Sequence, residues 1–211
     1  MKTIEWDDLL ESLPEEFRDE ETMKEFSGNA KFIVMEDKPE NTEICLDRHC
    51  YVDSENLHGI FVPGDLDIKL IYNSGADFDP LALVVLGKVS TDAIVVTGSK
   101  LTLLGEATCN DLFWGNGHGQ LKATDRVEAA IFVATNDYDV ERYWENFYFD
   151  YPLVDGSDQF GTPHLELVEK LFKDDVAIKA KGSSTSWADF LNRDMITALY
   201  LKGQTALKPV S

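Results

Sequence analysis

The chain has 211 residues, 44% hydrophobic and 11% aromatic, which is enough apolar material for one globular domain with a packed core. Its formal net charge of −20, from 19 basic and 39 acidic residues, disfavours nucleic acid and anionic membrane and favours a basic protein partner. The sequence has no apolar run of about 18 residues, and residues 1–8 lack the apolar segment of a signal peptide, so we expect a cytoplasmic protein.

Residues 1–30 predict an N-terminal helical cap. Thr3 is a suitable N-cap residue for a first helix over residues 4–13. The spacing of one helix face is found at Trp6, Leu9, Leu10 and Leu13. We expect this segment to cover either the open end of the core or one of its walls.

Residues 31–59 hold short β-forming segments at 31–35, 43–46 and 50–52, which predict irregular strands. They form either a first coil of the repeat described below or an edge beside it. Cys45 and Cys50 do not have the CxxC spacing, and no second pair of ligands follows them, so we predict buried cysteines, with no metal and no cofactor.

Residues 60–136 repeat one pattern four times: an apolar β-forming triplet, a bend, and a second apolar triplet. The repeat of roughly 18 to 23 residues has the length of one coil of a solenoid. The bends fall at Gly64, Gly87, Gly105 and Asp125. Stacked coils bury their apolar faces and line the core with ladders of like residues. The expected ladders are Ile60, Leu83, Leu101 and Leu121 on one wall, and Leu70, Ile94, Leu112 and Ile131 on another.

An antiparallel meander of short strands is the alternative to stacked coils. Tight hairpins favour Asn-Gly or Asp-Gly between two alternating halves, and the turns at 63–65, 98–100 and 115–119 do not fit that arrangement. We therefore predict a single domain, 1–211, that is mainly β with flanking α. Its core is a short, parallel, right-handed β-helix of about four coils, capped by N- and C-terminal helices.

The central segment offers few candidates for chemistry. The glycine-rich run 115–119 lacks the lysine and the Ser/Thr of a phosphate-binding loop. Cys109 and His118 could form a nucleophile and a base, but no third member accompanies them and the repeat register places Cys109 inside the coil. We therefore predict no catalytic residue.

Residues 137–161 mix carboxylates with aromatic side chains, as a surface that binds a basic protein would. The alternative is that the aromatic residues pack under the last coil while the acids face water. Paired carboxylates of a carbohydrate-active enzyme are also conceivable in so acidic a segment. The predicted partner-binding residues are Asn116, His118, Tyr138, Asp139, Glu141, Tyr143, Trp144, Glu145, Tyr148 and Asp150.

Residues 162–211 predict two helices. Thr162-Pro163 is a good start for the first, and Ser186 with Asp189 resembles a capping box at the start of the second. Gly203 marks the end of the second helix. We expect both helices to pack on the coil stack.

The segment 81–89, Leu-Ala-Leu-Val-Val-Leu-Gly-Lys-Val, resembles the L-x-V-x-G-x-V coils of bacterial right-handed parallel β-helices, of which bactofilin-like polymer-forming proteins are one group. With the other coils, the resemblance covers about a third of the chain. Small acidic proteins with such a core also resemble the immunity proteins that bacteria keep beside toxins.

These resemblances imply a non-enzymatic immunity protein that occludes the active site of a basic toxin domain, a nuclease being one option. The alternatives are a self-associating scaffold of bactofilin type and a carbohydrate-active β-helix enzyme. The sequence leaves open whether the protein is a monomer or a dimer.

Overall fold

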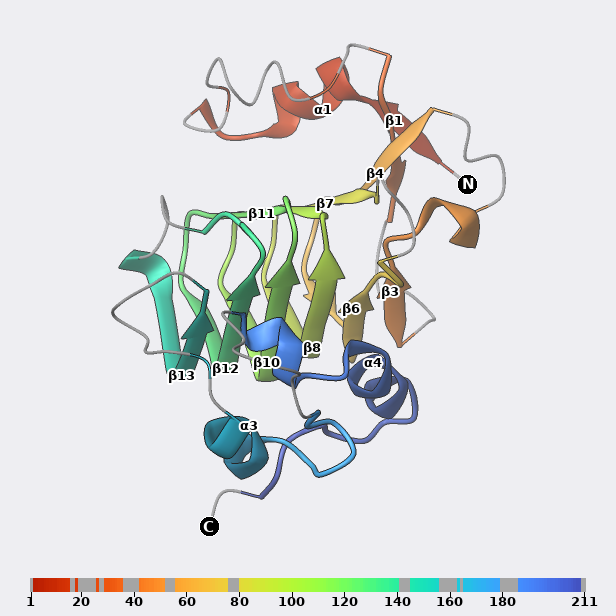
Figure 1. Ribbon diagram of the computed structural model, residues 1–211. Coiled ribbons are helices and arrows are strands. Elements are labelled where there is room, and N and C mark those ends of the chain that lie inside the picture. Colours follow the sequence, from red (N-terminus) through yellow and green to blue (C-terminus); the bar gives the residue numbers. More distant parts are fainter. Residues whose placement is uncertain are drawn as a thin grey trace.

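The structure is a computed structural model, shown in Figure 1. It describes residues 2–15, 18, 26, 29–35, 42–51, 56–75, 80–140, 145–155, 163, 165–178 and 186–209. Among these residues, no helix is both long enough and apolar enough to cross a membrane.

Thirteen strands dominate the part of the chain that the structure describes. They are β1 (Thr3–Glu5), β2 (Lys31–Val34), β3 (Glu43–Cys45), β4 (Leu57–Val62), β5 (Leu66–Asp67), β6 (Leu70–Tyr72), β7 (Ala82–Val85), β8 (Val89–Thr97), β9 (Lys100–Leu103), β10 (Ala107–Asn116), β11 (Gln120–Ala123), β12 (Val127–Thr135) and β13 (Phe147–Val154). The helices are α1 (Trp6–Ser12), α3 (Leu165–Leu171) and α4 (Arg193–Leu201), with 3₁₀ turns η2 (Arg48–Cys50) and η4 (Trp187–Phe190).

The strands form two sheets, and the chain alternates between them. One sheet has the order β1-β2-β4-β7-β9-β11 and the other β13-β12-β10-β8-β6-β3, with β5 beside β8. Every pairing except the antiparallel β1–β2 is parallel. The predicted parallel β-solenoid of about four coils is therefore confirmed, with coils at β4–β6, β7–β8, β9–β10 and β11–β12. The right-handed sense stays a prediction.

The solenoid extends beyond the predicted coils in both directions. Strands β2 and β3 pair in parallel with β4 and β6, and β13 pairs in parallel with β12. Residues 31–59 thus contribute strands to the solenoid stack itself. The segment 137–161 contributes its last strand, so part of its aromatic content packs as the alternative interpretation expected.

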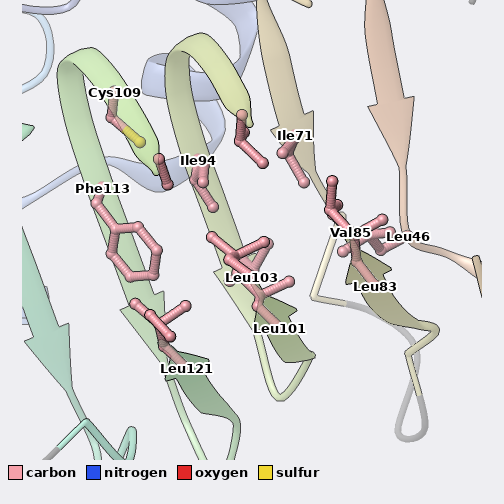
Figure 2. Close-up of a cluster of buried hydrophobic side chains, with 14 of the residues drawn as sticks. Leu46, Ile71, Leu83, Val85, Ile94, Leu101, Leu103, Cys109, Phe113 and Leu121 are labelled. Atoms are coloured by element: carbon pink, nitrogen blue, oxygen red, sulfur yellow. The ribbon is translucent and has the colours of Figure 1, made fainter. Parts of the chain in front are cut away.

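The first predicted ladder is confirmed, because Ile60, Leu83, Leu101 and Leu121 are successive register partners. Figure 2 shows three of these leucines facing Ile71, Ile94 and Phe113 across the interior. The second predicted ladder is wrong at one position. Leu70 pairs with Ala93, which pairs with Leu112, whereas Ile94 pairs with Ile71 and Phe113. A slip of one residue moves a side chain to the opposite face, so Ile94 points inward while the rest of that ladder points outward.

The strands of the second sheet change direction midway. In β12, Ala129 belongs to the solenoid interior and Ile131 to the outer cluster, although simple alternation would place both on one face. The β10–β12 register shifts between Cys109 and Leu112, as expected of a bulge that bends the strand. The coil therefore has two walls in this sheet. We name the first the bare wall (β5 with 89–91, 107–109, 127–129 and 147–149) and the second the covered wall (β6 with 93–97, 112–116, 131–135 and 151–154).

One corner of the coil carries a left-handed residue in successive turns. Gly75, Gly98 and Gly117 have φ values of 71°, 69° and 72°, and Asn136 occupies the next turn with a φ of 54°. Glycine adopts this conformation freely and asparagine tolerates it, which explains their recurrence.

None of the bend residues Gly64, Gly87 and Gly105 has a positive φ, so their backbone conformation does not require glycine. A Cβ on Gly64 would meet no atom within 4 Å, whereas Gly87 and Gly105 lie close to the neighbouring coil. A Cβ on Gly105 would lie 2.6 Å from the carbonyl oxygen of Gly87, so the coils stack too closely for a side chain there. Asp125 follows in register on the next coil and is exposed; its carboxylate accepts a hydrogen bond from the Arg126 amide at 2.7 Å.

The C-terminal elements pack on the covered wall. Its outward row, with Leu70, Ala93, Leu112 and Ile131, joins one buried cluster with Phe172, Trp187 and Ile196. Figure 1 shows α3 and α4 beside this sheet. Arg193 ties α4 to the corner after β6, where its guanidinium donates to the carbonyl oxygens of Asn73 and Ser74. The N-terminal α1 instead packs on the first sheet, against Phe32 and Phe61. The helices therefore cover walls of the stack, which is one of the two arrangements that we expected.

Three local predictions differ from the structure. Thr3 lies in β1 and Glu5 precedes α1, with no side-chain cap, because the chain first pairs with β2. The segment predicted as one helix from Ser186 divides into η4 and α4, since Asn192 caps α4 by accepting from the Met195 amide at 3.1 Å. Cys50 lies in η2 rather than in a strand.

Candidate partner-binding surface

The bare wall presents a polar outer face, since alternation turns its apolar residues inward. The inward row is buried and consists of Leu66, Val89, Ala107, Val127 and Phe147. The outward row, in the same register, consists of Asp67, Ser90, Thr108, Glu128 and Tyr148. Within the described part of the chain, no helix packs on this row, which therefore lines a solvent-facing surface.

An open groove of about 650 Å³ runs over the last coils of the bare wall. Its polar lining comes from β10, β12 and β13 and from the corner before β12. The lining includes Thr108, Asn110, Arg126, Glu128, Tyr148 and Asp150. A groove of this size and openness suits a protruding side chain or loop of a partner.

Tyr148 is the most exposed large hydrophobic side chain among the described residues, at 51%. The Arg126 guanidinium lies over its ring, 4.2 Å from the centroid, and also forms an ion pair with Glu128. The ring is therefore oriented before any partner arrives, which lowers the entropic cost of using it as an anchor. Arg126 therefore already contacts two side chains of this chain, Tyr148 and Glu128.

Carboxylates border the groove. Asp150 is exposed two residues after Tyr148 on the same side of β13, and Glu128 is half-exposed. Asp92 lies along the same edge, where it accepts a hydrogen bond from the side-chain amide of Asn110 at 2.9 Å. An aromatic ring between carboxylates is suited to a lysine or arginine side chain, because the ring offers a face and the acids offer charge.

Three predicted binding residues belong to this surface or its border. Tyr148 and Asp150 line the groove, and Glu145 is exposed just before β13. Glu128, Arg126 and Asn110 also shape the groove and were not predicted. The alternation of residues 127–130 could have placed Glu128 outside, but the choice of the bare wall depends on which wall the helices cover.

Three other predicted residues lie at a different corner, between the covered wall and the first sheet. The Asn116 side chain is engaged in a ladder, accepting from Thr135 and Asn136 at 2.8 Å each. His118 is exposed in the adjacent turn. Asp139 is exposed and accepts a hydrogen bond from the side-chain amide of Gln120 at 2.8 Å. The structure therefore separates the predicted set into two groups on different sides of the coil.

Tyr138 is buried, with 6% of its surface exposed, and packs against Phe113 in the interior. Burial raises the pKa of its phenol well above the usual range. Its ring fills space that Gly115 and Gly119 leave open, so we do not retain it as a partner contact. Glu141, Tyr143 and Trp144 lie outside the described residues.

Cys109 and His118 do not form a reactive pair. Cys109 faces the solenoid interior with 2% exposure, as its register predicted, and burial alone raises its thiol pKa strongly. His118 is exposed in a turn at another corner.

A second group of polar side chains lies at the start of the solenoid. Cys45, Asp47 and Cys50 present three possible metal-ligand atoms within 4.8 Å of one another. The two cysteines were predicted to be buried, but Cys45 is half-buried and Cys50 is exposed, because η2 folds the chain back after β3. Burial and the neighbouring Cys50 thiol raise the pKa of Cys45 to about 12, so the thiol is neutral near pH 7.

The fold and the groove define a class: a short parallel β-solenoid, helix-covered on one wall and bare on the next, with an acidic-aromatic groove on the bare wall. Comparisons with protein-family models, with curated proteins and with solved structures found no match to this chain.

Proposed function

We propose that this chain is a non-enzymatic binding protein of the bacterial cytoplasm that docks a basic protein on its bare wall. The partner proposed is a toxin domain, and the chain would act as its immunity protein. The observation that carries the proposal is the half-exposed, pre-oriented Tyr148 beside Glu128 and Asp150, on a wall without a helix among the described residues. The net charge of −20 adds long-range attraction for a basic partner.

The proposed mechanism is occlusion. A basic loop of the toxin enters the groove, where its cation meets Asp150 and Glu128 and its aliphatic stem packs on Tyr148. If the toxin is a nuclease, the carboxylates occupy the place of the substrate phosphates, because both present oxygen anions to arginine and lysine. The toxin active site is then closed without any chemistry in the immunity protein.

The test is a binding measurement with the protein encoded by the adjacent upstream gene, together with rescue of cells that express it. We expect tight 1:1 binding that weakens with added salt. The double variant E128K/D150K should weaken binding by about a hundredfold, equivalent to about 2.7 kcal/mol, and abolish rescue.

The double variant E166K/E169K is the matched control, because it makes the same change in charge at two exposed glutamates on α3, beside the covered wall. We expect E166K/E169K to keep nearly full affinity. Equal losses for E166K/E169K and E128K/D150K would show that only total charge matters and would remove the bare wall from the proposal. Absence of binding to the neighbouring gene product would remove the immunity role.

A carbohydrate-active enzyme is a second candidate, since the same open groove is lined by two carboxylates, Glu128 and Asp150, and an aromatic ring. Its test is hydrolysis of an oligosaccharide panel by the wild type and by E128Q and D150N. Hydrolysis that either variant abolishes would favour the enzyme, whereas an inactive wild type would favour the binding protein.

A further inference from the structure

The first coil brings two thiols and a buried carboxylate together. Strand β3 ends at Cys45, the chain turns inward at Asp47, and η2 returns it so that Cys50 faces Cys45. The two Sγ atoms lie 2.7 Å apart, and Cys45 Sγ lies 3.5 Å from Asp47 Oδ2. This grouping arises from a turn that the sequence spacing C-x-D-x-x-C does not reveal by itself.

Asp47 is the unusual member of the group. Its side chain is only 2% exposed, and Oδ2 accepts a hydrogen bond from the Ser74 amide at 2.7 Å. Its other oxygen, Oδ1, is buried and has no hydrogen-bond partner among the described residues. An ionised carboxylate oxygen buried without a partner is costly, so this atom calls for a cation, a proton or a water molecule.

Arg193 supplies only part of what Asp47 needs. Burial lowers the Arg193 pKa, and the negative charges of Asp194 and, to a smaller extent, Asp47 act to raise it, so Asp47 and Arg193 attract each other electrostatically. The guanidinium directs its hydrogen bonds to Asn73 and Ser74, however, and its own buried Nε has no hydrogen-bond partner in the described part of the chain. The Asp47 carboxylate is thus attracted by the Arg193 guanidinium but receives no hydrogen bond from it among the described residues.

We infer that Cys45, Asp47 and Cys50 form a binding site for a thiophilic divalent cation, with Zn²⁺ as the best match. Zinc binds thiolate sulfur at about 2.3 Å and carboxylate oxygen at about 2.0–2.2 Å. A tetrahedral arrangement then separates sulfur from oxygen by about 3.6 Å and the two sulfurs by about 3.8 Å. The separation of 3.5 Å between Cys45 Sγ and Asp47 Oδ2 fits without change, so the ion would bind Oδ2, and its charge would compensate the carboxylate whose Oδ1 has no partner among the described residues.

Only Cys50 has to move for the ion to enter. It is the exposed member and lies at the end of a short 3₁₀ turn, so a side-chain shift of about 1 Å opens the sulfur pair to the tetrahedral separation. Its exposure also gives the ion a route in and leaves the fourth position to water. Asp47 stays fixed, because the Ser74 amide orients it as an outer-shell partner.

A bound ion would connect distant parts of the chain. Cys45 belongs to β3, Asp47 contacts the corner at Ser74, and Arg193 of α4 donates to the same corner. The site would therefore lock the first coil onto both the next coil and the C-terminal helix. This role is independent of partner binding on the bare wall.

Titration of the reduced, chelator-treated full-length protein with Co²⁺ tests the site by spectroscopy. We expect sulfur-to-cobalt charge-transfer absorption that saturates at one ion per chain and is displaced by Zn²⁺. The C45S/C50S variant should lose it. D47N should weaken Co²⁺ affinity by about tenfold or more, since loss of even an outer-shell partner costs about 10–100-fold.

The matched controls are C109A, which removes the remaining thiol, and D67N, which makes the same change at an exposed aspartate. Both should bind Co²⁺ as the wild type does. A wild-type readout guards against misfolded variants: Zn²⁺ should protect Cys45 and Cys50 from alkylation by iodoacetamide, measured peptide by peptide. Unchanged alkylation rates with Zn²⁺, no charge-transfer band, or a band that survives C45S/C50S would each overturn the inference.

Discussion

The bare wall and the covered wall are built from the same strands, and both fill the solenoid interior with apolar side chains. They differ in their outward rows. On β10, Thr108 faces out on the bare wall and Leu112 on the covered wall. The outward residues, rather than the inward ladders, thus determine where the protein packs on itself and where its described surface stays exposed.

The largest effect is expected when one outward side chain of β10 is truncated on each wall. Leu112→Ala should lower the free energy of unfolding by about 2–5 kcal/mol, because it opens a cavity between β10 and the C-terminal helices. Thr108→Ala, four residues earlier, should change it by less than about 0.5 kcal/mol. Urea denaturation measures both, and equal effects would mean that the bare wall is also packed.

The second test compares an arginine from each region. Arg193→Met leaves the carbonyl oxygens of Asn73 and Ser74 without their charged donor, and should cost about 2–3 kcal/mol. Arg126→Met on the bare wall removes an exposed ion pair, with side chains 52% and 39% exposed, and should cost less than about 1 kcal/mol. Denaturation curves that show a larger loss for Arg126→Met than for Arg193→Met would contradict the conclusion that Arg193 fixes α4 to the covered wall.

The third test uses alkaline pH. Burial on the covered wall raises the pKa of Tyr200, whose hydroxyl donates to Asp111 at 3.2 Å. Above a pH of about 10, the unfolded chain releases this proton while the folded chain keeps it. The contribution of Tyr200 to the free energy of unfolding is complete below that pH. It decreases as the pH rises, by about 1.4 kcal/mol per pH unit. Tyr200→Phe should make the alkaline decline in stability shallower by that slope, whereas an unchanged slope would indicate an accessible hydroxyl.

The smallest expected effect is on the bare wall itself. Tyr148→Ala should alter the free energy of unfolding by no more than about 0.5 kcal/mol, since the ring is half-exposed and stacks on the exposed side chain of Arg126. Thermal denaturation at two salt concentrations is sufficient to measure it. A loss comparable with that of Leu112→Ala would identify Tyr148 as a packing residue and would weaken its proposed role as an anchor.

The sequence predicted the solenoid because inward positions must repeat. Ile60, Leu83, Leu101 and Leu121 occupy one interior row, and any polar residue there would disrupt the stack. The placement of Ile94 failed because the alternation along β8 resets between Val89 and Ala93, opposite the bulge in β10, and the uniformly apolar run 93–96 does not indicate which side chains face inward. Strand β13 was missed for a related reason, since its acids and aromatic residues resemble a surface segment.

The proposed binding surface was less predictable than the fold. Tyr148 and Asp150 were predicted because residues 137–161 mix aromatic side chains with carboxylates, and the structure shows that both are exposed on β13. Their contact with a partner stays a prediction. Tyr138 was assigned wrongly to the exterior, because its place inside depends on the space beside Gly115 and Gly119. The Cys45–Asp47–Cys50 grouping depends on η2, which a spacing rule for adjacent ligands does not detect.

The contact between Arg193 and Asn73 joins residues 120 positions apart. Coils can stack on their neighbours as soon as each leaves the ribosome, whereas the outward row with Ala93, Leu112 and Ile131 must wait for α4. During synthesis this apolar outward row is exposed to chaperones and to other nascent chains. Closure of so long a loop should also make docking of the last helix the slow phase of refolding, after rapid local assembly of the spiral.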